Sequence, residues 1–189
     1  MIRSRNGGGR TLVKGASNGV GNEVERLILA EAWQDARALI RKALRRESDS
    51  HWLWTRLSLT YYEQFQYGKA LKYAQRALEI APRCPLALWD AAGSLEMLGE
   101  VRAALAIYRG LIRHGPRAIA SGECGEGMAS ARGLVADCYY RAAGCYSTLG
   151  RRKAARTMLD NHFAMRGPGC RSIYPMSLAR ARRVALSAV

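Results

Sequence analysis

Residues 51–82 read HWLWTRLSLTYYEQFQYGKALKYAQRALEIAP, and this stretch predicts two helices separated by a short break. In its first half Trp54, Leu57 and Tyr61 follow one another at spacings of three and four residues, which places them on one face of a helix. In its second half small residues recur at the same spacings and allow two antiparallel helices to approach closely; they are Ala70, Ala74 and Ala77. Pro82 then ends the second helix.

The two-helix plan returns along the chain with a period of about 34 residues. Three series run in parallel with this period: Ala36, Ala70 and Ala104; Ala43, Ala77 and Leu111; and Ser48, Pro82 and Pro116. Because the series keep the same internal spacing, they indicate a repeated hairpin. A later copy is displaced by residues 117–135, whose glycine-rich run SGECGEG at residues 121–127 predicts a non-helical insertion.

The stretch from Trp54 to Pro82 resembles the tetratricopeptide repeat, whose pattern is W-x2-L-G-x2-Y, then A-x3-F, then A and a closing P. The matching positions are Trp54, Leu57, Tyr61, Ala70, Ala77 and Pro82, whereas Ser58 replaces the glycine and Ala74 the phenylalanine. The resemblance covers roughly residues 17–165. It implies an all-α fold, namely a right-handed superhelical solenoid of antiparallel helix hairpins.

The domain organisation follows from this repeat. We predict a basic N-terminal leader at residues 1–16, a repeat domain at 17–169 and a C-terminal capping helix within 170–189. The repeat domain consists of hairpins at 17–50, 51–84, 85–118 and 136–169, with an insertion at 119–135. A cap is needed because a terminal hairpin otherwise exposes an apolar face. A helix over 175–188 suits that role, with an apolar stripe of Leu178, Ala181, Ala185 and Ala188 and with Arg180, Arg182 and Arg183 off the stripe.

Composition narrows the class of protein. Hydrophobic residues make up 49% of the 189 residues, enough for a sizeable core, and no apolar run suits a signal peptide or a membrane span. The five cysteines are odd in number and form no C-x-x-C pair, which is typical of reduced thiols. We therefore expect a soluble cytoplasmic protein without a membrane partner.

No motif predicts catalysis, a cofactor or a metal site. Residues 11–21, TLVKGASNGVG, resemble the glycine turn of short-chain dehydrogenases, but no tyrosine in the chain is followed four residues later by a lysine. Helical hairpins also follow this turn in place of alternating strands. The three histidines lie apart, and none belongs to an H-E-x-x-H motif or stands beside a cysteine pair. We expect a binding protein, not an enzyme.

If the resemblance holds, the first helix of each hairpin lines a concave groove that binds a protein or peptide partner. The residues expected there are Trp52, Thr55, Arg56, Leu59, Tyr62, Trp89, Asp90, Gly93, Tyr140 and Arg141. Aromatic and arginine side chains are common interface anchors, so this set suits an extended peptide with apolar and acidic side chains. Trp52 and Trp89 have an alternative role in packing against neighbouring helices. Glu123 and Glu126 either belong to a tolerated loop or fold over the groove and contribute to binding.

The basic charge of the chain supports an alternative function, nucleic-acid binding. The 30 lysines and arginines outnumber 15 acidic residues and give a net charge of +15, most of it near the two ends of the chain. The residues expected to contact phosphates are Arg151, Arg152, Lys153, Arg156, Arg180, Arg182 and Arg183. The other interpretation is a solvated face, since aromatic residues for base stacking are not interleaved with them. The sequence leaves the identity of the partner and self-association open.

Overall fold

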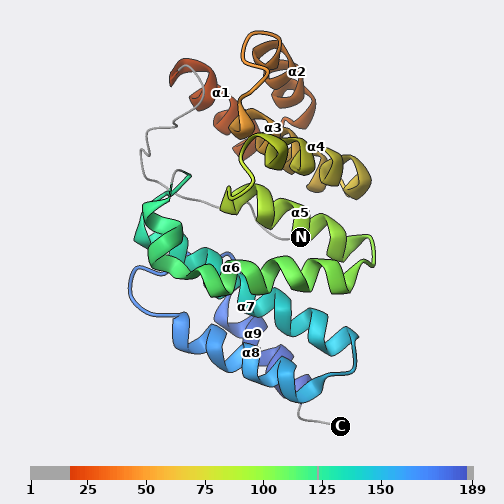
Figure 1. Cartoon of the computed structure of the whole chain (residues 1–189), viewed down its shortest axis with the longest axis vertical. Coiled ribbons are helices and arrows are strands. Elements are labelled where there is room, and N and C mark those ends of the chain that lie inside the picture. Colours follow the sequence, from red (N-terminus) through yellow and green to blue (C-terminus); the bar gives the residue numbers. More distant parts are fainter. Residues whose placement is uncertain (1–17, 123, 187–189) are drawn as a thin grey trace. The chain divides into compact units, whose positions relative to one another are not determined.

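The computed structural model describes residues 18–122 and 124–186, and every regular element in these ranges is an α-helix (Figure 1). The predicted all-α class is therefore confirmed. The chain divides between Leu98 and Gly99 into two compact units, which we name the N-terminal unit (residues 18–98) and the C-terminal unit (residues 99–186). The predicted leader at residues 1–16 lies outside the described residues, as does Ala188.

The N-terminal unit consists of α1 (Asn18–Leu29), α2 (Trp33–Leu44), α3 (His51–Tyr62), α4 (Tyr67–Ile80) and α5 (Pro85–Met97). Each helix packs against the next one, and α3 also packs against α5. This pattern is expected of stacked hairpins, in which the first helices of successive repeats contact each other. Local sequence sets two of the helix starts. The hydroxyl of Ser50 caps α3, and Pro85 occupies the first turn of α5, where its missing N–H is not needed.

The turns inside the hairpins repeat with the period of the sequence. Glu31, Phe65 and Gly99 have positive φ angles of 55°, 59° and 86°, and they follow one another at the same interval as Ala36, Ala70 and Ala104. Gly150, with a φ of 70°, adopts the same left-handed conformation in the last hairpin, at a longer interval because the insertion precedes it. A left-handed residue ends a helix and reverses the chain. The backbone therefore carries the same period as the side chains.

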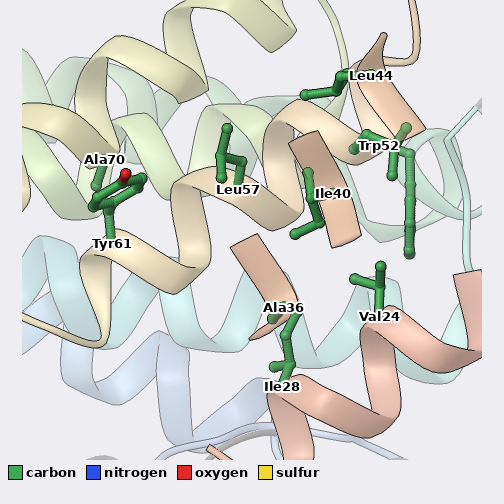
Figure 2. Close-up of a cluster of buried hydrophobic side chains, with 10 residues drawn as sticks. Val24, Ile28, Ala36, Ile40, Leu44, Trp52, Leu57, Tyr61 and Ala70 are labelled. Atoms are coloured by element: carbon green, nitrogen blue, oxygen red, sulfur yellow. The ribbon is translucent and has the colours of Figure 1, made fainter. Parts of the chain in front are cut away.

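The core of the N-terminal unit joins large side chains of α1 to α3 with small residues of α2 and α4 (Figure 2). Its buried members include Val24, Ile28, Ala36, Ile40, Leu44, Trp52, Leu57, Tyr61 and Ala70. The serine at the glycine position of the repeat links α3 to α4, because the Ser58 hydroxyl donates to the Ala70 carbonyl oxygen at 2.8 Å. Trp54, at the first position of the repeat pattern, stacks on Tyr73 of α4 with ring centroids 5.9 Å apart.

The C-terminal unit consists of α6 (Val101–Ser121), α7 (Met128–Thr148), α8 (Arg152–Met165) and α9 (Met176–Ala185). α7 packs against both α6 and α8, and α9 packs against α8. α6 bends at Gly115, whose φ of 77° and ψ of 162° are not helical. The bend lies directly before Pro116, because a proline disfavours the helical conformation of the preceding residue.

The prediction that residues 117–135 are not helical is wrong at both ends of this stretch. α6 extends to Ser121 and α7 begins at Met128, so only residues 122–127 separate the two helices. Three glycines fall within that gap, whereas the residues on either side include many good helix formers such as alanine, arginine and leucine. Helix propensity acts residue by residue, so the glycines interrupt the helix only where they occur.

A C-terminal helix is present, but the apolar stripe predicted for it is wrong. The stripe residues Leu178, Ala181 and Ala185 are exposed. α9 instead buries Ala179 and turns Arg182 toward α7, where the guanidinium carbon lies 4.0 Å from the centroid of the Tyr140 ring. A stacked arginine and a single alanine therefore set the rotation of this helix, and a hydrophobic pattern does not distinguish them from their neighbours.

Within the described ranges, none of the helices combines the length and the apolar character that crossing a lipid bilayer would require. All five cysteines are free thiols. Cys84, Cys138 and Cys145 are buried.

Candidate partner-binding surfaces

Eight of the ten predicted groove residues lie on α3 and α5, two helices of the N-terminal unit that contact each other. Five of these side chains are half-buried, and we name them the α3–α5 surface: Arg56, Leu59, Tyr62, Trp89 and Asp90. Each combines a part fixed by its neighbours with a part that reaches solvent. A partner's side chains can bind to such a surface without a rearrangement of the helices beneath it.

The other three predicted residues of these helices are buried beneath that surface. Trp52 is 8% exposed and belongs to the core, in line with its alternative packing role. Thr55 is 2% exposed, and its hydroxyl donates to the His51 carbonyl oxygen one turn earlier. Gly93 gives room to a neighbouring ring, because a Cβ atom there would lie 3.3 Å from Cε2 of Tyr62. These residues support the α3–α5 surface and do not form part of its exposed area.

The charge of Arg56 is already compensated. Its Nε donates to Oε1 of Glu25 on α1 at 2.6 Å, and its guanidinium carbon lies 5.2 Å from the centroid of the Trp52 ring. At the end of α3, burial raises the pKa of the Glu63 carboxyl, and the nearby Glu31 carboxylate raises it further. The α3–α5 surface therefore offers apolar area and a paired arginine, and the Glu63 carboxyl at the end of α3 resists ionisation.

Tyr140 and Arg141, the remaining two predicted groove residues, lie on α7 in the C-terminal unit and are covered by the chain itself. Tyr140 is 2% exposed and stacks on Tyr174 with ring centroids 4.1 Å apart. Arg141 is 7% exposed and donates from Nη1 to the Tyr174 hydroxyl at 3.1 Å. The residues that cover this face belong to the segment between α8 and α9, residues 166–175, which we name the strap.

Sequence reasoning missed the residues of α7 that hold the strap. Asp137 is fully buried, and its carboxylate accepts hydrogen bonds from the hydroxyl of Ser172 and from the N–H of Ile173, the latter at 3.1 Å. Gly133 lies one turn earlier on the same face. A signal was present in the sequence, since an acidic residue in an otherwise apolar stretch of helix is rarely buried without a partner.

The two glutamates predicted to fold over the groove stay untested. Glu123 lies outside the described residues. Glu126 is exposed in the short stretch between α6 and α7.

Several arginines proposed to contact phosphates have partners within the C-terminal unit. Arg156 donates to the Leu186 carbonyl oxygen at 2.8 Å, and Arg183 pairs with Asp160 at 3.0 Å. Arg182 donates to the Tyr140 carbonyl oxygen at 3.1 Å. These contacts attach α9 to α7 and α8. The remaining candidates are exposed, and three of them line an open hollow around the first turn of α8: Arg151, Arg152 and Lys153.

Comparison with protein-family models matches residues 51–84 to the tetratricopeptide repeat. No curated protein matches the sequence.

Solved structures resemble the chain in fold. A structure of MamA from Desulfovibrio magneticus RS-1, starting at its residue 41, has a TM-score of 0.62 at 13% identity and covers 77% of this chain and 73% of its own. Another MamA crystal structure has a TM-score of 0.60 at 16% identity and covers 89% and 84%. YrrB, described as a TPR protein with an unusual peptide-binding site, covers 87% and 90% at 18% identity, but its TM-score of 0.46 is too low to support a conclusion. At such identities a likeness shows the fold alone.

Proposed function

We propose that this chain, which is a tetratricopeptide-repeat protein, is a protein-binding scaffold that holds an extended segment of a partner protein on the α3–α5 surface. The observation that carries the proposal is the position of five half-buried side chains on two helices that contact each other, α3 and α5. Side chains that are already fixed by their neighbours lose little conformational entropy when a partner binds. Binding rests on surface complementarity and includes no covalent step and no cofactor.

The partner segment that we propose is mainly apolar. Leu59, Tyr62 and Trp89 supply apolar and aromatic area, the kind that dominates binding energy at protein interfaces. Acidic side chains in the partner add less, because Arg56 already has a carboxylate partner in Glu25. The acidic component of the expected peptide is therefore the weaker part of its recognition.

Photocrosslinking from single positions tests this proposal. A photoreactive amino acid at Leu59 should capture a partner protein in the native cell, whereas the same amino acid at Leu71, a half-buried leucine of α4, should not. Adding Trp89→Ala should reduce the crosslink from position 59 about tenfold, since aromatic anchors often contribute more than the energy of a tenfold change. Equal capture from both positions, or capture that survives Trp89→Ala together with Tyr62→Ala, would contradict the proposal.

Nucleic-acid binding is a second candidate, supported by the exposed basic residues around the first turn of α8. The variant Arg151→Ala/Arg152→Ala/Lys153→Ala should weaken binding of a labelled single-stranded oligonucleotide and lower the salt dependence of that binding. Arg102→Ala/Arg109→Ala/Arg113→Ala, which changes exposed arginines of α6, is the control. If both triple variants lose equal affinity, the charge acts without a defined site.

We also propose a cytoplasmic location, because the free thiols of all five cysteines suit a reducing compartment.

Whether copies of the chain associate is measured by light scattering of the purified protein. Self-association through the α3–α5 surface would make a second copy the partner, and Leu59→Asp should then produce monomers.

A further inference from the structure

The strap follows the face of α7 step by step. The N–H of Arg171 donates to the Ala129 carbonyl oxygen at 3.3 Å, Ser172 and Ile173 bond to Asp137, and Tyr174 stacks on Tyr140. From residue 133 to 140, α7 rises about 10 Å, and three residues of extended chain span up to about 10 Å. The strap and the helix therefore advance together, from Arg171 beside Gly133 to Tyr174 beside Tyr140.

The contacts between α7 and the strap involve both the backbone and the side chains of the strap, as contacts of a binding surface with a peptide do. The buried Asp137 carboxylate accepts a hydrogen bond from a backbone N–H and another from a serine hydroxyl, so it contacts both the backbone and a side chain of the strap. Arg141 donates to the phenol oxygen of Tyr174, a hydrogen bond that a phenylalanine could not accept. Gly133 lets the backbone come close, because a Cβ atom there would lie 2.2 Å from the Arg171 carbonyl oxygen.

Outside its contacts with α7, the strap is held by a few hydrogen bonds within itself: Arg166 Nη1 donates to the Tyr174 carbonyl oxygen at 2.8 Å, and the Tyr174 N–H donates to the Ser172 hydroxyl at 3.2 Å. It contains no helix, and its turn at residues 167–170 has a left-handed glycine, Gly169, with a φ of 77°. The helix that follows buries mainly Ala179 and is otherwise attached by arginine contacts. A segment with few contacts except to one receptor face opens at lower free energy than the helices beneath it.

We propose that the face of α7 built from Gly133, Asp137, Tyr140 and Arg141 is a second peptide-binding site, and that the strap occupies it as an intramolecular ligand. The ligand it takes is an extended segment with a serine and a tyrosine two residues apart. A partner segment of this pattern binds by displacing the strap. The site lies in the C-terminal unit and does not depend on the α3–α5 surface.

A tethered ligand lowers the apparent affinity for a free one, because only molecules with an open strap bind it. This gives the test. The probe is a labelled peptide of residues 168–177 with serine in place of Cys170, and its binding to the full-length chain is followed by fluorescence polarisation. The wild-type chain should bind it weakly. Ser172→Ala/Tyr174→Ala, which weakens the strap, should bind it at least about tenfold more tightly.

Three controls make the result specific to the site. Asp137→Asn in the weakened-strap background should remove the gain, and a peptide with alanine in place of its tyrosine should show none. Leu59→Asp should leave binding of the peptide unchanged, so that failure here and failure of the α3–α5 proposal are separate results. Equal peptide affinity of the wild-type and weakened-strap chains, or a gain that survives Asp137→Asn, would overturn the inference.

Hydrogen exchange of the wild-type chain tests the same inference if the double variant does not fold. Excess unlabelled peptide should speed exchange of the Ile173 amide, because the peptide takes its place on Asp137. The peptide without tyrosine should leave the rate unchanged. An Ile173 amide whose exchange is insensitive to both peptides would show that the strap is a fixed part of the fold.

Discussion

The helices α3 and α7 are each the first helix of a hairpin, yet their corresponding faces have different surroundings. On α3, Leu59 and Tyr62 are half-buried and the Arg56 side chain is 15% exposed, whereas on α7 Tyr140 and Arg141 are covered by the strap. Hydrophobicity does not explain the difference, since a tyrosine and an arginine occur on both faces. The chain beyond the last hairpin supplies the cover. A repeat position therefore predicts where a residue lies on its helix, and segments outside the repeat decide whether it is available.

The same tyrosine-to-alanine change on the two sides should give the largest difference. Tyr174→Ala removes a buried ring and the phenol partner of Arg141, so we expect a loss of about 3–5 kcal/mol in the stability of the closed strap. Tyr62→Ala removes a half-exposed ring and should cost about 1–2 kcal/mol. Hydrogen exchange of amides in the strap and in α3 measures the two losses. Equal losses would mean that the strap is held no more tightly than the open face.

A glycine-to-alanine change on each side should give the next largest difference. At Gly133 the new Cβ would meet the Arg171 backbone at 2.2 Å, so the strap must move, and we expect a net loss of about 2 kcal/mol. At Gly93 it would meet only the end of the Tyr62 ring at 3.3 Å. There the better helix propensity of alanine, about 1 kcal/mol, should offset the contact. Thermal unfolding of both variants checks this; a larger loss at Gly93 would contradict it.

Acid should affect the two units in opposite directions. His162 of α8 is buried, its Nδ1 lies 2.8 Å from the Ala136 carbonyl oxygen, and its Nε2 has no hydrogen-bond partner among the described residues. Burial lowers the pKa of His162 from its ordinary value of 6.5. The unfolded chain therefore binds this proton more readily, and the C-terminal unit should lose stability as the pH falls below that value.

The raised pKa of Glu63 in the N-terminal unit has the opposite consequence. In the folded chain, burial makes the charged form of the Glu63 carboxyl unfavourable, and this cost disappears when the carboxyl is protonated. The N-terminal unit should therefore gain stability as the pH falls toward the ordinary value of 4.5. Unfolding of wild type, His162→Gln and Glu63→Gln across this pH range separates the two effects. The first variant should be less sensitive to mild acid than wild type, and the second should lack the gain. An unchanged pH profile for either variant would contradict the assigned cause.

Exposed ion pairs should distinguish the two units least. Arg183 pairs with Asp160 in the C-terminal unit, and Arg76 pairs with Glu79 in the N-terminal unit, with all four side chains at least half exposed. Solvent screens such pairs, so Arg183→Ala and Arg76→Ala should each cost less than about 1 kcal/mol. Denaturation in low and moderate salt measures this. A larger loss for Arg183→Ala would show that this exposed pair, and not the contacts of Arg156 and Arg182, is the main attachment of α9.

Much of the fold could be predicted from the sequence because it depends on local spacing. The series that includes Ala36 and Ala70 predicts small residues at buried positions, and both alanines are fully buried in the structure. The rotation of α9 about its axis could not be predicted, because its alanines are equally hydrophobic. The contact of Arg182 with the Tyr140 ring decides which of them is buried. The candidate site divides in the same way. The sequence placed Leu59 and Trp89 on their helices, and Asp137 indicated a partner for α7, but nothing in the sequence identified the strap as the segment that covers Tyr140.

The sequence by itself determined the period, the helices and the small residues at which they meet, because each depends on neighbours within about one helical turn or one repeat. Only the tertiary structure decided which faces stay open. Asp137 and Ser172 lie 35 residues apart, and their hydrogen bond exists because the chain after α8 returns to α7. Contacts at such separation depend on the path of the backbone, which no local pattern of residue types encodes.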